Sequence, residues 1–84
     1  MYRVVTYSEA LEQIAALPAE ALPFYAEVIG VLELAPAAGR PYNEDKPDGP
    51  MRELVFGANG EGTTTYLILD HQREVQVILV QWVG

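Results

Sequence analysis

The stretch MRELVFGANGEGTTTYLIL, from Met51 to Leu69, decides the fold. Its two ends, MRELVF and TTTYLIL, are rich in the β-branched and aromatic residues that strands favour. The segment between them, GANGEG, contains the Asn-Gly pair typical of a hairpin turn. We therefore predict strands over residues 51–56 and 63–69, joined as a hairpin. Arg52 opens this hairpin, and the functional question is whether it binds a phosphate or only keeps a strand soluble.

A further strand follows the hairpin. The residues DHQR at 70–73 indicate a tight turn, and EVQVILVQWV at 74–83 is apolar on both faces at its centre, as in the middle of a sheet. Strict alternation directs Val75, Val77 and Leu79 to one face, and Ile78, Val80 and Trp82 to the other.

The N-terminal half is predicted to be a strand followed by two helices. YRVVTY at 2–7 favours a strand, and Ser8 is a suitable N-cap for a helix that ends before Pro18. Apolar residues then recur at helical spacing from Leu22 until Pro36 ends the second helix. Gly30 within that helix suggests close packing against a neighbour. The predicted order is β-α-α-β-β-β, with the two helices forming an antiparallel hairpin.

The segment APAAGRPYNEDKPDGP, residues 35–50, is predicted to be a long loop. Loops of this length without regular structure are uncommon in compact domains and often carry function. A plain surface connection is the alternative, and the sequence leaves both open.

Length and composition indicate one small domain over residues 1–84. Half of the residues are hydrophobic, which argues against disorder. There is no cysteine, so a disulfide framework and thiolate metal sites are excluded. The N-terminus lacks the apolar run of a signal peptide, and the longest aliphatic runs are too short to cross a bilayer. We expect a soluble cytoplasmic protein with no membrane contact.

Charge argues against a general nucleic-acid binder. Twelve acidic residues outnumber five basic ones, and the formal net charge is −7. Between Val4 and Gly39 there are five glutamates and no cation. Phosphate neutralisation supplies most of the affinity of nucleic-acid binders, and this half would repel a phosphate backbone. Any anion site must therefore lie in the second half, which holds four of the five cations.

Several kinds of chemistry are excluded or disfavoured by residue type. His71 is the only histidine, so no histidine cluster can hold a metal, and no metal or other cofactor is expected. NEDKPDG resembles a calcium loop only superficially, because Lys46 falls at a ligand position. GANGEGTT lacks the lysine of a phosphate-binding loop and joins two strands. A triad of Ser8, His71 and Asp70 is disfavoured because the last two are neighbours in a turn.

Taken together, these segments resemble the RelE/ParE superfamily of small toxins from bacterial type II toxin–antitoxin modules. The resemblance covers nearly the whole chain, including YRVVTYSEAL, the helical segment IAALPAEALPFYAEVIGVLEL, the loop, and the strands MRELVFG, TTTYLILD and VQVILVQWV. It is greatest for short actinobacterial members, in which P-x-R-x-L-V-F-G precedes T-Y-L-I-L. The resemblance implies an α+β fold, with a twisted, four-stranded, mainly antiparallel sheet, a helical hairpin on one face and an open concave face on the other. It also implies an antitoxin that wraps the toxin.

In the ribosome-dependent ribonuclease branch of this superfamily, basic residues and an aromatic on the concave face promote attack of a 2′-hydroxyl on the adjacent phosphate of mRNA. Arg52 falls near the first basic position, and Tyr66 matches the strand tyrosine. The arginine expected before that tyrosine is replaced within Thr63–Thr65. His71 and Arg73 complete the candidate catalytic set, which needs no metal.

Each candidate also has a structural interpretation. Arg52 could form a salt bridge to Glu53 or a cross-strand carboxylate, Tyr66 could be a core residue with a hydrogen-bonded hydroxyl, and the turn pair could be solvated. Trp82 could line a groove for a base or a partner, or plug the open face of the sheet. Tyr42 and Arg40 in the long loop are further candidates for binding RNA or a partner. Register matters too, since a slip of one residue exchanges Arg52 for Glu53 on the concave face.

Three functional classes follow from the resemblance. The first is a metal-independent endoribonuclease that cuts mRNA at the ribosome (an mRNA interferase). The second is a toxin directed at a protein target. The third is a catalytically degenerate toxin fold that acts as an interaction module, for example with its antitoxin. A homodimer is also left open.

Overall fold

The computed structural model describes residues 1–84 as an α+β domain with one five-stranded sheet. The strands are β1 (Arg3–Thr6), β2 (Arg40–Pro41), β3 (Met51–Phe56), β4 (Gly62–Leu69) and β5 (Glu74–Trp82), and the helices are α1 (Ser8–Ala15) and α2 (Leu22–Leu34). Short 3-10 turns cover Ala19–Ala21, Pro36–Ala38 and Asp70–Gln72. The predicted fold class and the central hairpin are confirmed, and β3 has the predicted bounds.

The strand order in the sheet is β1-β5-β4-β3-β2. β1 runs parallel to β5, and the other neighbours are antiparallel, so the sheet is mainly antiparallel as expected. The prediction of four strands was wrong, because Arg40 and Pro41 pair with Glu53 and Arg52 as a fifth. A two-residue strand in a Pro/Gly-rich segment has no alternation by which it could be recognised. It places one edge of the sheet inside the segment predicted to be a loop.

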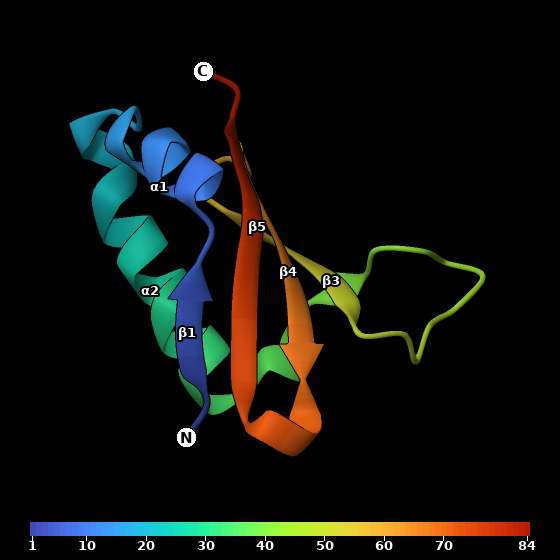
Figure 1. The fold of residues 1–84 in the computed structure, drawn as a ribbon. Coiled ribbons are helices and arrows are strands. Elements are labelled where there is room, and N and C mark those ends of the chain that lie inside the picture. Colours follow the sequence, from blue (N-terminus) through green and yellow to red (C-terminus); the bar gives the residue numbers. More distant parts are fainter.

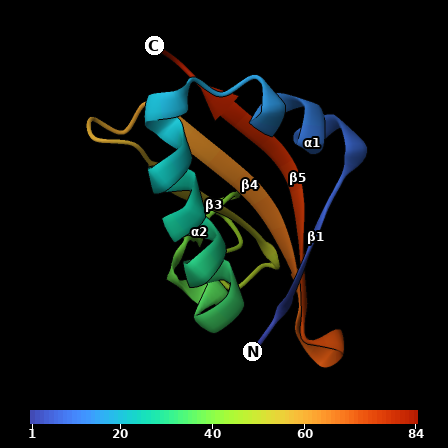
Figure 2. The same ribbon diagram turned by 90° about the vertical axis from the view of Figure 1, so that its left-hand side faces the viewer.

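Both helices cover one face of the sheet (Figures 1 and 2). They are not antiparallel, since the chain bends by 112° between α1 and the segment Ala19–Leu34. Ser8 is the first residue of α1 and makes no side-chain capping bond, so its predicted role as N-cap was wrong. The packing predicted for Gly30 was wrong too, because nothing lies within 4 Å of the position that a Cβ would occupy there.

The core lies between the helices and the sheet. Its largest fully buried side chains include Tyr66, Leu32 and Val77. An irregularity between Thr65 and Tyr66 shifts the register with β5, so that Tyr66 pairs with Val77 and Thr65 with Leu79. Such a bulge interrupts the alternation of side chains along the strand. Val77 and Val80 of β5 therefore both face the core, and the predicted strict alternation of side chains along β5 was wrong.

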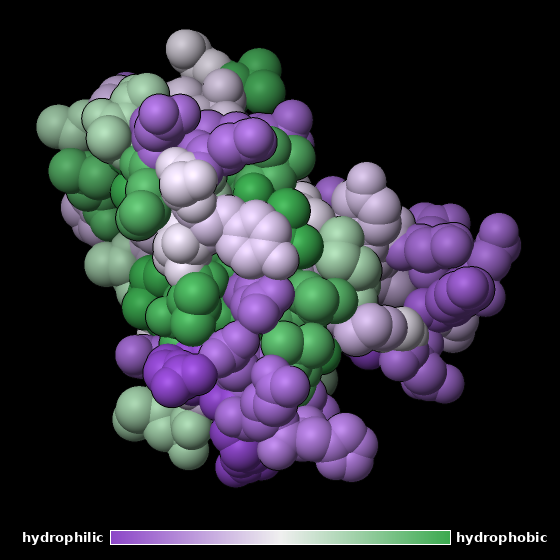
Figure 3. Space-filling model, viewed as in Figure 1, coloured by the Kyte–Doolittle hydropathy of each residue, from purple (hydrophilic) through white to green (hydrophobic).

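The N-terminus of the chain, before β1, and the C-terminus, after β5, lie at opposite ends of the sheet in Figure 1. The chain from β2 to β3 forms a loop that projects away from the helices. The space-filling view in Figure 3 shows that the surface of this loop is mostly hydrophilic. No single helix is long and apolar enough to cross a membrane. α1 and the segment Ala19–Leu34 reach the required length and composition only as a bent pair.

Candidate functional site

Arg52 lies on the helix-covered face of β3, the face it shares with Leu54 and the buried Phe56. Its guanidinium donates hydrogen bonds to the carbonyl oxygens of Gly39 (3.3 Å) and Pro47 (3.0 Å). The Nε atom is buried and has no partner. No carboxylate lies within ion-pairing distance, so the alternative of a salt bridge to Glu53 or to a cross-strand carboxylate is not observed. Arg52 instead connects β3 to the residue that precedes β2 and to the loop between β2 and β3.

Tyr66 lies directly across the ladder from Arg52 and is fully buried. Its hydroxyl donates a hydrogen bond to the carbonyl oxygen of Pro36. Burial raises the pKa of Tyr66, although contact with the Gly39 backbone and the charge of Arg52 oppose this shift. The hydroxyl is buried and hydrogen-bonded, which fits the structural interpretation of this tyrosine, and it is not accessible to a substrate.

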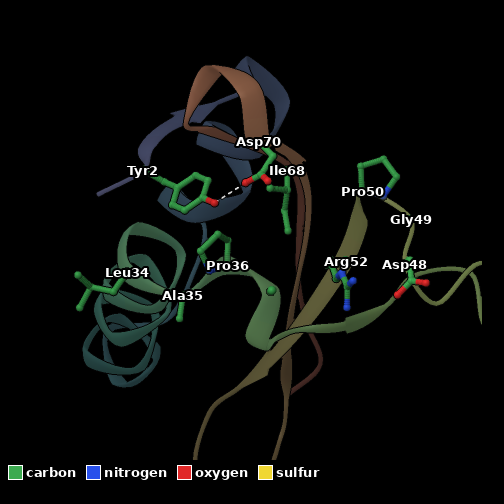
Figure 4. A pocket seen from close by; sticks show the side chains of 11 residues that line it. Tyr2, Leu34, Ala35, Pro36, Asp48, Gly49, Pro50, Arg52, Ile68 and Asp70 are labelled. Carbon is green, nitrogen blue, oxygen red and sulfur yellow. Dashed lines mark hydrogen bonds between the residues drawn. The ribbon is translucent and has the colours of Figure 1, made fainter.

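A cavity of about 400 Å³ opens beside Arg52. It lies between the C-terminal end of α2, the following 3-10 turn and the ends of β3 and β4. Figure 4 shows Arg52 and Asp48 on one side of it, with Tyr2 and Leu34 on the other. The Tyr2 hydroxyl is hydrogen-bonded to Asp70, and this bond raises the pKa of Tyr2. Two carboxylates and one guanidinium line the cavity, so it is not a positively charged pocket.

The face of the sheet opposite the helices, here called the open face, carries Arg40 and Glu53. These two residues are register partners on β2 and β3, and Arg40 Nε lies 3.3 Å from Glu53 Oε1. At the other edge of the sheet, Arg3 on β1 pairs in the same way with Glu74 on β5. The hydrogen bond from Arg3 lowers the pKa of Glu74, and a second from Gln76 acts in the same direction. Each arginine of the open face is thus neutralised by a carboxylate.

The remaining candidates lie apart from one another. His71 and Arg73 belong to the β4–β5 turn, where Arg73 adopts a left-handed conformation (φ 51°) and stacks over the Tyr2 ring at 4.7 Å. Trp82 packs against Phe56 on the helix-covered face, so it does not plug the open face. Tyr42 is 55% exposed on the loop after β2.

The five cations form no common patch. Two lie at opposite edges of the open face, one lies on the helix-covered face, one in the β4–β5 turn and one on the projecting loop: Arg3, Arg40, Arg52, Arg73 and Lys46. The register decides this outcome, because it sends Glu53 to the open face and Arg52 to the opposite face. No group of three or more His, Asp or Glu side chains is arranged to hold a metal ion.

No protein-family model and no curated protein matches the chain. Solved structures do match. E. coli RelE in the intact RelBE toxin–antitoxin complex superimposes with a TM-score of 0.72 at 20% identity, covering 100% of this chain and 99% of that one. The chain has the RelE fold.

The RelE fold recurs in two further structures. Isolated E. coli RelE toxin gives a TM-score of 0.73 at 18% identity over 100% of this chain and 86% of that one. Archaeal RelE from the Pyrococcus horikoshii RelE–RelB complex gives 0.66 at 14% identity over 99% and 96%. The α+β fold expected from the superfamily resemblance is thereby confirmed, at 14–20% sequence identity.

Sequence analysis missed one surface of this RelE fold. A groove of about 410 Å³ runs between α2 and β3, and Phe24, Val28, Val31, Leu54 and Phe56 are among the residues that line it. Apolar residues recur at helical spacing along α2, but the sheet covers only part of them: Val28 and Leu32 are buried, whereas Leu22 is exposed. The signal in the sequence that could have revealed this groove is the width of the apolar stripe on α2, which exceeds what one small sheet can bury.

Proposed function

We propose that this chain is a RelE-like toxin of a type II toxin–antitoxin module that acts in the bacterial cytoplasm by binding proteins. Its first partner is an antitoxin encoded by the neighbouring gene. Two considerations support a protein partner. RelE proteins of the same fold form complexes with RelB in E. coli and in Pyrococcus horikoshii. The chain also leaves an apolar groove of about 410 Å³ open at its surface, and such patches are common at protein interfaces.

The dispersal of the cations is the observation that favours a protein target over RNA. Arg3 and Arg40 are each paired with a carboxylate, and Arg73 lies over the ring of Tyr2. With a net charge of −7, the chain offers little electrostatic attraction to an RNA backbone. Because phosphate neutralisation supplies most of non-specific RNA affinity, a protein-directed activity fits better.

Metal-independent cleavage of mRNA at the ribosome is the second candidate. Arg52 supports it, since this side chain has no carboxylate partner and borders a cavity of about 400 Å³. An arginine so placed could hold a phosphate once it leaves the two carbonyls that it now contacts. His71 and Arg73 in the adjoining turn are the exposed groups that remain from the candidate catalytic set.

Induced expression distinguishes these functions. The chain is produced alone and together with the product of the neighbouring gene, and growth, complex formation and mRNA integrity are measured. Growth arrest that the neighbour relieves, with intact mRNA, supports the protein-directed toxin. mRNA cleavage that Arg52→Ala abolishes establishes the ribonuclease instead. Absence of both arrest and complex overturns the proposal that this is a toxin with an antitoxin partner.

A further inference from the structure

The cavity beside Arg52 contains charges that no residue of the chain neutralises. Arg52, Asp48 and Asp70 line it, and none of the three is in an ion pair. Both ion pairs of the chain lie on the open face instead. Arg52 is half-buried, and a guanidinium in such a position is normally matched by a carboxylate. A bound ligand would supply the missing opposite charges.

At the Arg52 end of the cavity, the free groups fit a carboxylate. A guanidinium has five N–H donors. That of Arg52 makes two hydrogen bonds, one from each terminal nitrogen, so each of these nitrogens keeps one N–H without a partner. Such N–H groups bind carboxylates, and here they can do so without leaving Gly39 and Pro47. Asp48 lies on the same side of the cavity, and its charge disfavours a doubly charged phosphate more than a carboxylate.

At the opposite end of the cavity, Asp70 and the end of α2 favour a cation. One carboxylate oxygen of Asp70 accepts a hydrogen bond from Tyr2, and the other makes none. α2 ends at Leu34, which lines the cavity, and its last turn contains no basic residue. The C-terminal end of a helix carries a partial negative charge. Arg73 lies over the Tyr2 ring but makes no ion pair with Asp70, so this end can accept an ammonium group.

The two ends of the cavity are separated by an apolar wall. Asp70 comes four residues after Tyr66, which is the ladder partner of Arg52. At roughly 3.3 Å per strand residue, Arg52 and Asp70 lie about 13 Å apart along the sheet at the level of the backbone. Ile68 and Pro36 line the cavity, and Figure 4 shows Ile68 between the Arg52 and Asp70 side chains. A ligand that meets both ends must therefore carry its two charges on a chain of several carbon atoms.

We propose that this cavity binds a small linear zwitterion. Arg52 holds its carboxylate, Asp70 and the end of α2 hold its ammonium group, and its aliphatic chain packs against Ile68 and Pro36. ω-Amino acids and dipeptides both have this chemistry. The volume of about 400 Å³ is within the range of small-molecule sites. The site shares no residue with the groove between α2 and β3, and it does not depend on the proposed function.

Ligand analogues test the two charges separately. ω-Aminohexanoate carries both charges, whereas hexanoate and hexylamine each carry one. Calorimetric titration of the full chain should show saturable binding of ω-aminohexanoate, with each singly charged analogue about tenfold weaker or more. Equally tight binding of hexylamine would refute the role of Arg52, and equally tight binding of hexanoate that of Asp70.

The dipeptide glycyl-leucine distinguishes the two sources of this chemistry. If it binds more tightly than ω-aminohexanoate, the ligand is a short peptide, and if it binds more weakly, the ligand is an ω-amino acid. If neither compound binds saturably, there is no zwitterion site in this cavity.

Asp70→Asn, compared with Asp45→Asn, tests the ammonium end. Both substitutions remove one negative charge from an exposed residue, but Asp45 lies outside the cavity. An asparagine can still accept the hydrogen bond from Tyr2, and circular dichroism checks that both variants fold. Asp70→Asn should weaken binding of ω-aminohexanoate about tenfold and leave the weak binding of hexanoate unchanged, whereas Asp45→Asn should change neither. Equal weakening by both variants would show that only the net charge matters, and would overturn the inference.

Nuclear magnetic resonance locates the bound probe. Titration of isotope-labelled protein with ω-aminohexanoate should shift the amide signals of Ala35 and Gly49 and the side-chain Nε–H signal of Arg52. The signals of Phe24 and Val28, which line the groove instead, should stay in place. Shifts at the groove with none around Arg52 would refute the assignment to this cavity.

Discussion

Arg52 lies directly opposite Tyr66 in the β3–β4 ladder, and both side chains hold the same short segment, Pro36–Gly39. Tyr66 donates to the first carbonyl of this segment and Arg52 to the last. The pair anchors the turn that leaves α2 and enters β2, and Arg52 additionally binds Pro47 across the loop. The question raised by the hairpin sequence thus has a structural answer in this conformation: Arg52 fastens a loop.

Replacing Arg52 by alanine should loosen the loop. We expect Arg52→Ala to lower the free energy of unfolding by about 1–2 kcal/mol, since a charged donor to two carbonyls is lost from a half-buried position. Amide hydrogen exchange should rise in residues 39–50. Denaturant unfolding and exchange mass spectrometry measure the two effects.

Arg40→Ala is the control for that experiment. Its ion pair with Glu53 is exposed, and such pairs contribute about 0.2–1 kcal/mol. Unchanged exchange in residues 39–50 of Arg52→Ala would contradict the anchoring role. In that case the Arg52 side chain would be available for another role, such as binding a phosphate.

The position of Gly39 should not accept a side chain. An added Cβ would clash with the Tyr66 hydroxyl and lie 2.7 Å from the Glu53 carbonyl oxygen. Because the obstacles are a buried hydroxyl and backbone, Gly39→Ala should lower the free energy of unfolding by about 1–3 kcal/mol. Thermal and denaturant unfolding provide the measurement.

Gly30→Ala is the same chemical change as Gly39→Ala, but we expect it to have the opposite effect on the free energy of unfolding. Gly30 lies in α2 with no atom within 4 Å of the added Cβ. Alanine there should raise the free energy of unfolding by about 0.4–1 kcal/mol, since it favours the helix and restricts the unfolded chain. A stabilised Gly39→Ala, or a destabilised Gly30→Ala, would show that the packing around these glycines differs from that described.

Stability should decline in acid partly through Glu74. Hydrogen bonds from Arg3 and Gln76 hold the folded-state pKa of Glu74 below its ordinary value of 4.5. The resulting stabilisation is fully present above the pKa of the unfolded chain, and it is lost as the pH falls through the lower folded-state pKa. Glu74→Gln should therefore weaken the decline in stability below about pH 4.5.

Arg3→Ala tests the cause of that shift. Removing the arginine should bring the pKa of Glu74 back toward its ordinary value, and the acid dependence should weaken as in Glu74→Gln. Urea unfolding from pH 7 to pH 3 gives the required curves. If both variants keep the wild-type dependence, the carboxylates responsible for acid sensitivity lie elsewhere.

Local patterns were sufficient for most of the fold. The hairpin of β3 and β4 follows from β-branched residues around an Asn-Gly turn, and both are properties of neighbouring residues. β2 could not be predicted, because its two residues are defined only by their pairing with β3. The bulge near Tyr66 could not be predicted either, because a strand that is apolar on both faces has the same sequence pattern with and without a bulge.

The candidate site was less predictable than the fold. Arg40, Arg52 and Arg73 were each identified as candidates, but their positions relative to one another depend on strand order and register. The arrangement of Arg52, Asp48 and Asp70 around one cavity is likewise a property of the tertiary structure, because these residues come from a strand, a loop and a turn.

The sequence by itself determined the order of the two helices and the four longer strands, the absence of cysteine chemistry and the strong negative charge, since these depend on residue type and short-range pattern. Only the tertiary structure decided which face of β3 carries Arg52 and which charged side chains share its cavity. Side chains alternate between faces with a period of two residues, so a single step of register exchanges an arginine for a glutamate at the same place. That step is set by packing across the whole sheet, which no local segment contains.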